Sequence, residues 1–115
     1  MRAFAVLACL VAVTACKRGG AGEHACPQVG ARFYALAHAQ VDADTTLSGP
    51  ERRGVIGLLA PMRDSLVRAC TEDKWAQPAR ACFVGAADRT AFYACEAGLT
   101  AEQRALLAKH ASGKR

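Results

Sequence analysis

The sequence predicts an all-α domain, a single small bundle of four to five short helices crosslinked by two disulfides. Three observations support this fold class. Apolar residues recur every three or four positions along most of the chain. Alanine is abundant, whereas strong strand formers are scarce after the N-terminal segment. Several segments also begin with residues that cap helices, so the chain is expected to fold as one small helical domain.

The first two helices are expected to form an antiparallel hairpin. The first begins at Cys26-Pro27, because proline is favoured in the first turn, and ends near residues 42–46. One face of this helix carries Val29, Phe33, Leu36, Ala37 and Val41. The pattern Ser48-Gly-Pro-Glu51 is typical of the start of a second helix. Its expected apolar stripe consists of Val55, Leu59, Met62, Leu66 and Cys70. Pro61 lies inside this helix and predicts a kink, because it cannot donate to the carbonyl of Gly57.

The C-terminal half predicts three shorter helices. A third helix is expected over residues 76–87 and a fourth over residues 89–97. Either Asp88 or Thr90 would cap the fourth helix, because both side chains can accept a hydrogen bond from a free N–H of the first turn. The segment 100–110 begins with Thr-Ala-Glu-Gln, which resembles a capping box and predicts a fifth helix.

The N-terminal segment has the organisation of an export signal. Arg2 supplies a positive charge, and residues 3–13 form an apolar run that is shorter than the roughly 20 residues of a membrane-spanning helix. The run ends in Val13-Thr-Ala-Cys16, which resembles the lipobox of bacterial lipoproteins. The resemblance implies cleavage before Cys16, a diacylglycerol group on its thiol and a further acyl chain on its amine.

The lipoprotein resemblance also implies a domain organisation and a location. The expected regions are a signal peptide at 1–15, a lipid-anchored tether at 16–25, a helical domain at 26–111 and a basic tail at 112–115. Two or three acyl chains on Cys16 would bind the membrane firmly, whereas one chain binds only marginally. The residue after this cysteine is Lys17 and not aspartate, which in the sorting known from Gram-negative bacteria favours the periplasmic face of the outer membrane.

Four cysteines of the expected helical domain predict two disulfides: Cys26, Cys70, Cys82 and Cys95. An even number of cysteines is typical of short exported domains. Cys82 and Cys95 are nearly equidistant from the turn at Asp88, and Cys26 and Cys70 lie at the outer ends of the helical hairpin. These positions favour Cys26–Cys70 with Cys82–Cys95. The alternative, Cys70–Cys82 with Cys26–Cys95, stays open because Cys70 and Cys82 are also symmetric about a turn.

A second resemblance covers about residues 26–107. Its elements are a Cys and a Trp separated by four residues, an Arg-x-Cys, a later Cys and a Leu-Thr-x-Glu-Gln-Arg end, found here at 70–75, 80–82, 95 and 99–104. This pattern resembles small cysteine-containing helical lipoproteins and secreted proteins of myxobacteria, a group without a known activity. The resemblance implies the fold and the compartment and adds no reaction.

The placement of charge argues against nucleic acid as a partner. The formal net charge is +5, but six of the 15 Lys and Arg residues lie in the signal, the tether and the C-terminal end. All ten acidic residues lie between Glu23 and Glu102, so the helical domain is close to neutral. It contains no basic patch interleaved with aromatic residues. Lys17 and Arg18 would instead favour anionic lipid headgroups, by about 1 kcal/mol each.

No residue pattern specifies an enzyme, so we predict a protein without a catalytic site and without a cofactor. The serines after the signal, Ser48, Ser65 and Ser112, have no nucleophile-elbow context. His38 and Asp42 are four residues apart on the first helix and could touch, but no nucleophile accompanies them. They are therefore predicted to form a solvated pair.

No metal site is predicted either. Glu23, His24 and Cys26 place three possible ligands together, but no second cluster has zinc-site spacing. The cysteine would also be oxidised in an exported protein.

The function predicted on these grounds is that of a membrane-anchored, non-catalytic binding or structural module of the cell envelope, with an envelope protein of unknown identity as its partner. The alternative is a small-ligand carrier or enzyme with a site that the sequence does not reveal. The aromatic residues could line a ligand groove or fill the core: Trp75, Phe83, Phe92 and Tyr93. A deep apolar pocket with converging polar groups would favour the carrier. A solid core with one exposed apolar stripe would favour the module.

Overall fold

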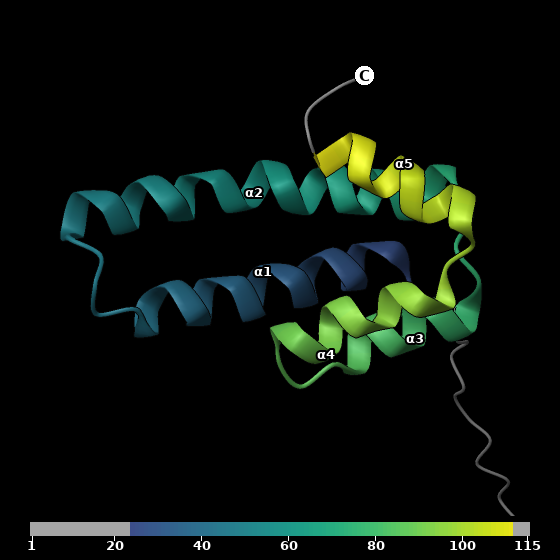
Figure 1. Ribbon diagram of the computed structural model, residues 1–115, viewed down its shortest axis with the longest axis horizontal. Coiled ribbons are helices and arrows are strands. Elements are labelled where there is room, and N and C mark those ends of the chain that lie inside the picture. The colour runs from purple at the N-terminus through teal and green to yellow at the C-terminus, as the bar shows by residue number, and fades with distance from the viewer. Residues whose placement is uncertain (1–23, 112–115) are drawn as a thin grey trace, which may run out of the picture.

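Helices make up all the regular structure of residues 24–111, the part of the chain that the computed structural model describes (Figure 1). Their order is α1 (Cys26–Ala43), α2 (Gly49–Glu72), α3 (Gln77–Gly85), α4 (Arg89–Ala94), the 3₁₀ helix η1 (Cys95–Gly98) and α5 (Ala101–Ala111). The predicted all-α fold is confirmed. The expected signal peptide, Cys16 and the basic tail lie outside the described residues.

The two longest helices, α1 and α2, run antiparallel and form the long side of the molecule (Figure 1). The predicted capping box at the start of α2 is present. The Ser48 hydroxyl accepts from the N–H of Glu51 at 3.1 Å, and the Glu51 carboxylate accepts from the N–H of Ser48 at 2.8 Å. The turn before α2 is held by the guanidinium of Arg52, which donates to the carbonyls of Val41 and Asp44. Local hydrogen bonds therefore define both sides of this turn.

Helix α2 continues through Pro61 as one helix of 24 residues. Its packing against α1 depends on a glycine of α1. A Cβ added at Gly30 would lie 2.4 Å from Cγ2 of Val67, closer than real contacts allow. The two helices therefore approach closely at this position, where a larger residue would force them apart.

The shorter helices form a second layer on the hairpin, with α3 and α4 against α1 and α5 against α2 (Figure 1). Four aromatic rings connect the layers. The ring centroids of Trp75 and Phe83 are 5.1 Å apart, those of Phe83 and Phe92 are 4.8 Å apart, and Phe92 lies 6.1 Å from Phe33 of α1. All four rings are buried, so these aromatics fill the core between the layers.

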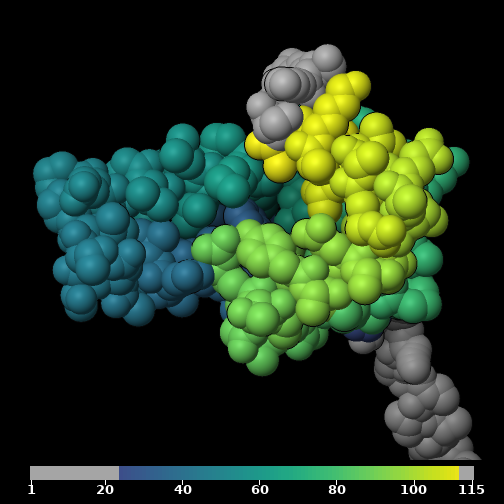
Figure 2. Space-filling model, in the orientation of Figure 1, coloured from purple at the N-terminus to yellow at the C-terminus, as the bar shows by residue number. Residues whose placement is uncertain are grey.

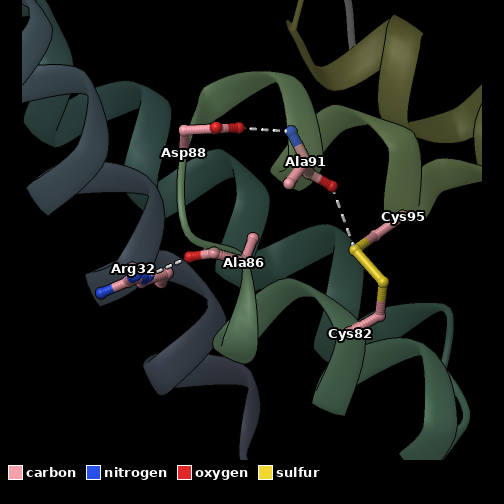
Figure 3. The surroundings of a disulfide bond; sticks show 6 residues. All are labelled: Arg32, Cys82, Ala86, Asp88, Ala91 and Cys95. Carbon is pink, nitrogen blue, oxygen red and sulfur yellow. Dashed lines mark hydrogen bonds between the residues drawn. A yellow bond between two sulfur atoms is a disulfide. The ribbon is translucent and has the colours of Figure 1, made fainter.

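Both disulfides have the favoured pairing. Cys26–Cys70 joins the start of α1 to the end of α2, and Cys82–Cys95 joins α3 to η1 (Figure 3). The Cα atoms are 5.6 and 5.7 Å apart, as disulfide geometry requires. Nearby, Arg32 of α1 donates to the carbonyl of Ala86 at 2.7 Å and holds the α3–α4 turn against α1 (Figure 3). The two disulfides are compatible with export to an oxidising compartment.

Some local expectations differ from the structure. Asp88, and not Thr90, caps α4, because its carboxylate accepts from the N–H of Ala91 at 2.8 Å. The expected fourth helix is α-helical only to Ala94 and continues as the 3₁₀ helix η1, and α3 is shorter than expected. Met62, expected on the buried stripe of α2, is 47 % exposed, because α4 and α5 cover this turn of α2 only in part.

Candidate functional site

An apolar pocket of about 310 Å³ lies where the ends of α4 and α5 meet the middle of α2. Figure 2 faces the side of the molecule on which α5, in yellow, lies over α2, while α4, in green, lies against α1. Phe33, Phe83 and Phe92 belong to the buried core and also line the pocket. Leu107 of α5 adds a half-buried aliphatic side chain. The described part of the protein therefore carries a mostly apolar hollow that opens to the surface.

The pocket exists because the second layer is too short to cover α2. Helix α4 has six residues and α5 has eleven, whereas α2 has 24. Leu66 of α2 is covered and buried, but Met62, one turn earlier, lies at the edge of the pocket. One turn further, Leu58 is 62 % exposed and does not line the pocket. The apolar surface of α2 thus extends beyond the pocket toward the start of the helix.

Tyr93 of α4 forms another part of the rim and is held in place by an arginine. The guanidinium of Arg89 donates to the Tyr93 hydroxyl at 2.7 Å and to the side-chain oxygen of Gln40 at 2.8 Å. It also lies over the Tyr93 ring, with the guanidinium carbon 5.2 Å from the centroid. The ring therefore has a defined position beside the pocket although it is 41 % exposed.

Three further polar side chains line the pocket: Ser65 of α2, Glu96 of η1 and His110 of α5. None of the three makes a side-chain hydrogen bond or ion pair with another residue of 24–111. The backbone carbonyl of Glu96, by contrast, accepts from the N–H of Leu99 at 3.0 Å and from Arg104 at 3.4 Å. These polar groups are thus available to a bound molecule.

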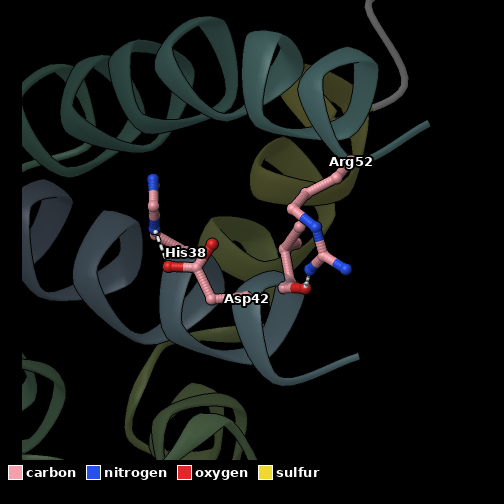
Figure 4. A network of polar contacts seen from close by, with 4 residues as sticks. His38, Asp42 and Arg52 are labelled. Atoms are coloured by element: carbon pink, nitrogen blue, oxygen red, sulfur yellow. Dashed lines mark hydrogen bonds and ion pairs between the residues drawn. The ribbon is translucent and has the colours of Figure 1, made fainter. Parts of the chain in front are cut away.

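The predicted pair of His38 and Asp42 is confirmed on α1. The imidazole Nδ1 lies 2.9 Å from a carboxylate oxygen of Asp42, and both side chains are well exposed (Figure 4). The guanidinium of the neighbouring Arg52 donates to the backbone carbonyl of Val41, in the last turn of α1 (Figure 4). Neither side chain lines the pocket.

In the sequence, His24 and Cys26 lie close enough together to be possible metal ligands, but in the structure Cys26 forms a disulfide. The sulfur of Cys26 is bonded to Cys70, so it is not a thiolate ligand in this state. Among residues 24–111, no three His, Cys, Asp or Glu side chains are grouped so that they could hold one ion. Glu23, the third residue of that group, lies outside the described part.

Two carboxyl groups at the connection between α1 and α2 have lowered pKa values. Hydrogen bonds from the hydroxyl and the N–H of Thr46 lower the pKa of Asp44. The hydrogen bond from the N–H of Ser48 lowers the pKa of Glu51. Both groups belong to turn and capping motifs, so their pKa shifts have a structural cause.

Sequence reasoning named few residues of the pocket correctly. It gave the aromatic residues two alternative roles, and the structure shows both: Trp75 lies only in the core, whereas Phe83 and Phe92 belong to the core and to the pocket wall. It missed Glu96 and His110, which carry no motif. Leu58, an apolar residue of α2 outside the expected buried stripe, was a weak indication that this helix has apolar surface beyond the core.

None of the helices between residues 24 and 111 is both long enough and apolar enough to cross a bilayer. Comparison with known proteins found no match: no family model, no curated protein and no solved structure matches the chain.

Proposed function

We propose that the chain is an exported lipoprotein, anchored through Cys16 at the periplasmic face of the outer membrane, whose helical domain binds small apolar molecules without chemical conversion. The observation that carries this proposal is the pocket between α2, α4 and α5. Its volume of about 310 Å³ lies at the lower end of the range of about 300–1,000 Å³ typical of ligand sites. Its aromatic and aliphatic lining with a few polar groups also has the composition of such sites.

The N-terminal lipobox supports the same function. A domain tethered by residues 17–25 would remain close to a lipid surface, where apolar compounds accumulate. Tethering raises the effective concentration of a binding partner on that surface without any new contact. The proposed anchor and the proposed pocket would therefore act together, since a small site of modest affinity is useful only where its ligand is abundant.

A neutral fluorescent probe, N-phenyl-1-naphthylamine, tests this proposal. The protein for the test begins at residue 23 and is produced with its disulfides formed, because the core and the two disulfides that the structure describes lie within residues 24–111. We expect saturable fluorescence enhancement with one site per chain. Met62→Glu should weaken binding at least tenfold, since it places a charge at the pocket edge.

Leu58→Glu is the matched control, because Leu58 is exposed on the same helix one turn away and does not line the pocket. It should leave the affinity within twofold of that of the unaltered protein. Equal loss in both variants would place the probe on the open apolar surface of α2 and contradict the pocket as the binding site. Absence of saturable binding would contradict the proposed function itself.

A further inference from the structure

We infer that the pocket takes a primary amine on a short hydrocarbon chain, with the chain against the aromatic wall and the ammonium group at the carboxylate of Glu96. This inference rests on the proposed function and narrows its ligand from apolar molecules in general to cationic amphiphiles. Two features of the pocket carry it: the size and chemistry of its apolar part, and the unpaired acidic group in its lining.

The apolar part suits a short chain. The volume of about 310 Å³ is about twice that of an engineered cavity of 150 Å³ that binds benzene. Phe83 and Phe92 form its inner wall with an edge-to-face contact, and Leu107 closes the side toward α5. Burial of each methylene group against this wall is favourable, so the hydrocarbon chain of the ligand contributes to binding in proportion to its buried length.

Glu96 supplies the charge preference. Its side chain is half-buried, it lines the pocket, and its carboxylate has no hydrogen bond or ion pair within residues 24–111. Partial burial of a carboxylate is unfavourable unless a donor or a cation compensates for the lost water. A ligand ammonium group would provide both.

The arginines nearest to this site are engaged elsewhere. Arg104 donates to the backbone carbonyls of Leu99, at 2.7 Å, and Glu96, and not to the carboxylate. Arg89 is directed to the Tyr93 hydroxyl and to Gln40. The structure therefore leaves the Glu96 carboxylate to an incoming cation, although both arginines contact residues that line the pocket.

His110 is the basic residue in the pocket lining and could favour an anion when protonated. Its position opposes that preference. It lies in the last turn of α5, and the C-terminal end of a helix carries partial negative charge, which disfavours an anion. Phe92, which also lines the pocket, is an aromatic residue, and the face of an aromatic ring attracts a cation. A cationic head group is therefore favoured over an anionic one.

Three ligands with the same chain and different head groups test the inference: octylamine, octanol and octanoate. Each is titrated into the ¹⁵N-labelled protein at pH 8, and amide shifts of α2, η1 and α5 are followed. We expect octylamine to bind at least tenfold more tightly than octanoate, with octanol between them. Glu96→Gln should weaken octylamine about tenfold and leave octanol within twofold.

Glu102→Gln is the matched control, because Glu102 is exposed in the first turn of α5 and does not line the pocket. It should preserve the order of the three ligands. Octanoate binding as tightly as octylamine, or an unchanged order in Glu96→Gln, would overturn the cationic preference. Such a result would leave the proposed function intact if the naphthylamine probe still binds in a manner sensitive to Met62→Glu. Absence of octylamine shifts would also overturn the inference.

Discussion

Gly30 of α1 and Val67 of α2 lie so close that a methyl group on Gly30 would be 2.4 Å from Cγ2 of Val67. Gly30→Ala should therefore destabilise the protein, although alanine favours a helix by about 1 kcal/mol relative to glycine. Overpacking of a close contact costs about 1–3 kcal/mol, so we expect a net loss of about 1 kcal/mol in the free energy of unfolding. Urea denaturation measures this change.

Gly57→Ala provides the opposite case on α2, because an added Cβ at Gly57 would meet nothing within 4 Å. This variant should be up to about 1 kcal/mol more stable than the unaltered protein. If Gly30→Ala stabilised the protein as much as Gly57→Ala, the close approach of α1 and α2 would be incorrect.

The two disulfides should contribute unequally to stability. Cys26–Cys70 spans 44 residues and Cys82–Cys95 spans 13. On chain-entropy grounds their removal should cost about 4 and about 3 kcal/mol, respectively. Replacing both cysteines of each pair by serine and measuring thermal unfolding checks the order, and the variant without Cys26–Cys70 should have the lower Tm. Non-reducing peptide mapping of the unaltered protein is the control, and a Cys26–Cys95 peptide would contradict the observed pairing.

The capping box of α2 should make stability depend on pH in the acid range. Since its hydrogen bond to Ser48 lowers the pKa of Glu51 in the folded state, this carboxylate stabilises the fold above its unfolded-state pKa, near 4.5. That contribution is lost as the pH falls below 4.5 and through the lower folded-state pKa. Glu51→Gln should therefore be less stable than the unaltered protein at pH 7 and about equally stable at pH 2.

Chemical denaturation of both proteins at several pH values measures this convergence. Glu72→Gln serves as the control, because Glu72 lies in the last turn of the same helix, with only a 4.0 Å contact to Arg68. A stability difference between Glu51→Gln and the unaltered protein that stays constant from pH 7 to pH 2 would show that the carboxylate charge of Glu51 does not stabilise α2.

The lipobox predicts a specific N-terminus. The protein isolated from membranes should begin at Cys16 and carry the mass of a diacylglycerol group and a further acyl chain, which intact-mass spectrometry measures. Cys16→Ala should prevent this modification and release the protein from membranes or stop its processing. Cys9→Ala, a cysteine within the expected signal, should have neither effect. A mature protein without acyl mass that starts at another residue would be incompatible with the proposed anchor.

The sequence by itself determined the features that depend on neighbouring residues. The capping box of Ser48 and Glu51 and the pair of His38 and Asp42 require only a few residues of helix, and both are present as predicted. The helical spacing of apolar residues likewise identified the elements and the all-α class, because periodicity along one helix is a local property. The exact end of α4 was not predictable, since the change to a 3₁₀ helix depends on local geometry that several residues share.

Only the tertiary structure decided how these helices combine. Symmetry about turns left two disulfide pairings open, and the packing of α3 against η1 together with the α1–α2 hairpin selected one. Met62 has the same periodicity as the buried Leu66, but its exposure depends on how far α5 reaches along α2. Ser65 and Glu96 carry no signal in the sequence because they come from separate elements. They line one pocket only because helices of unequal length leave part of α2 uncovered.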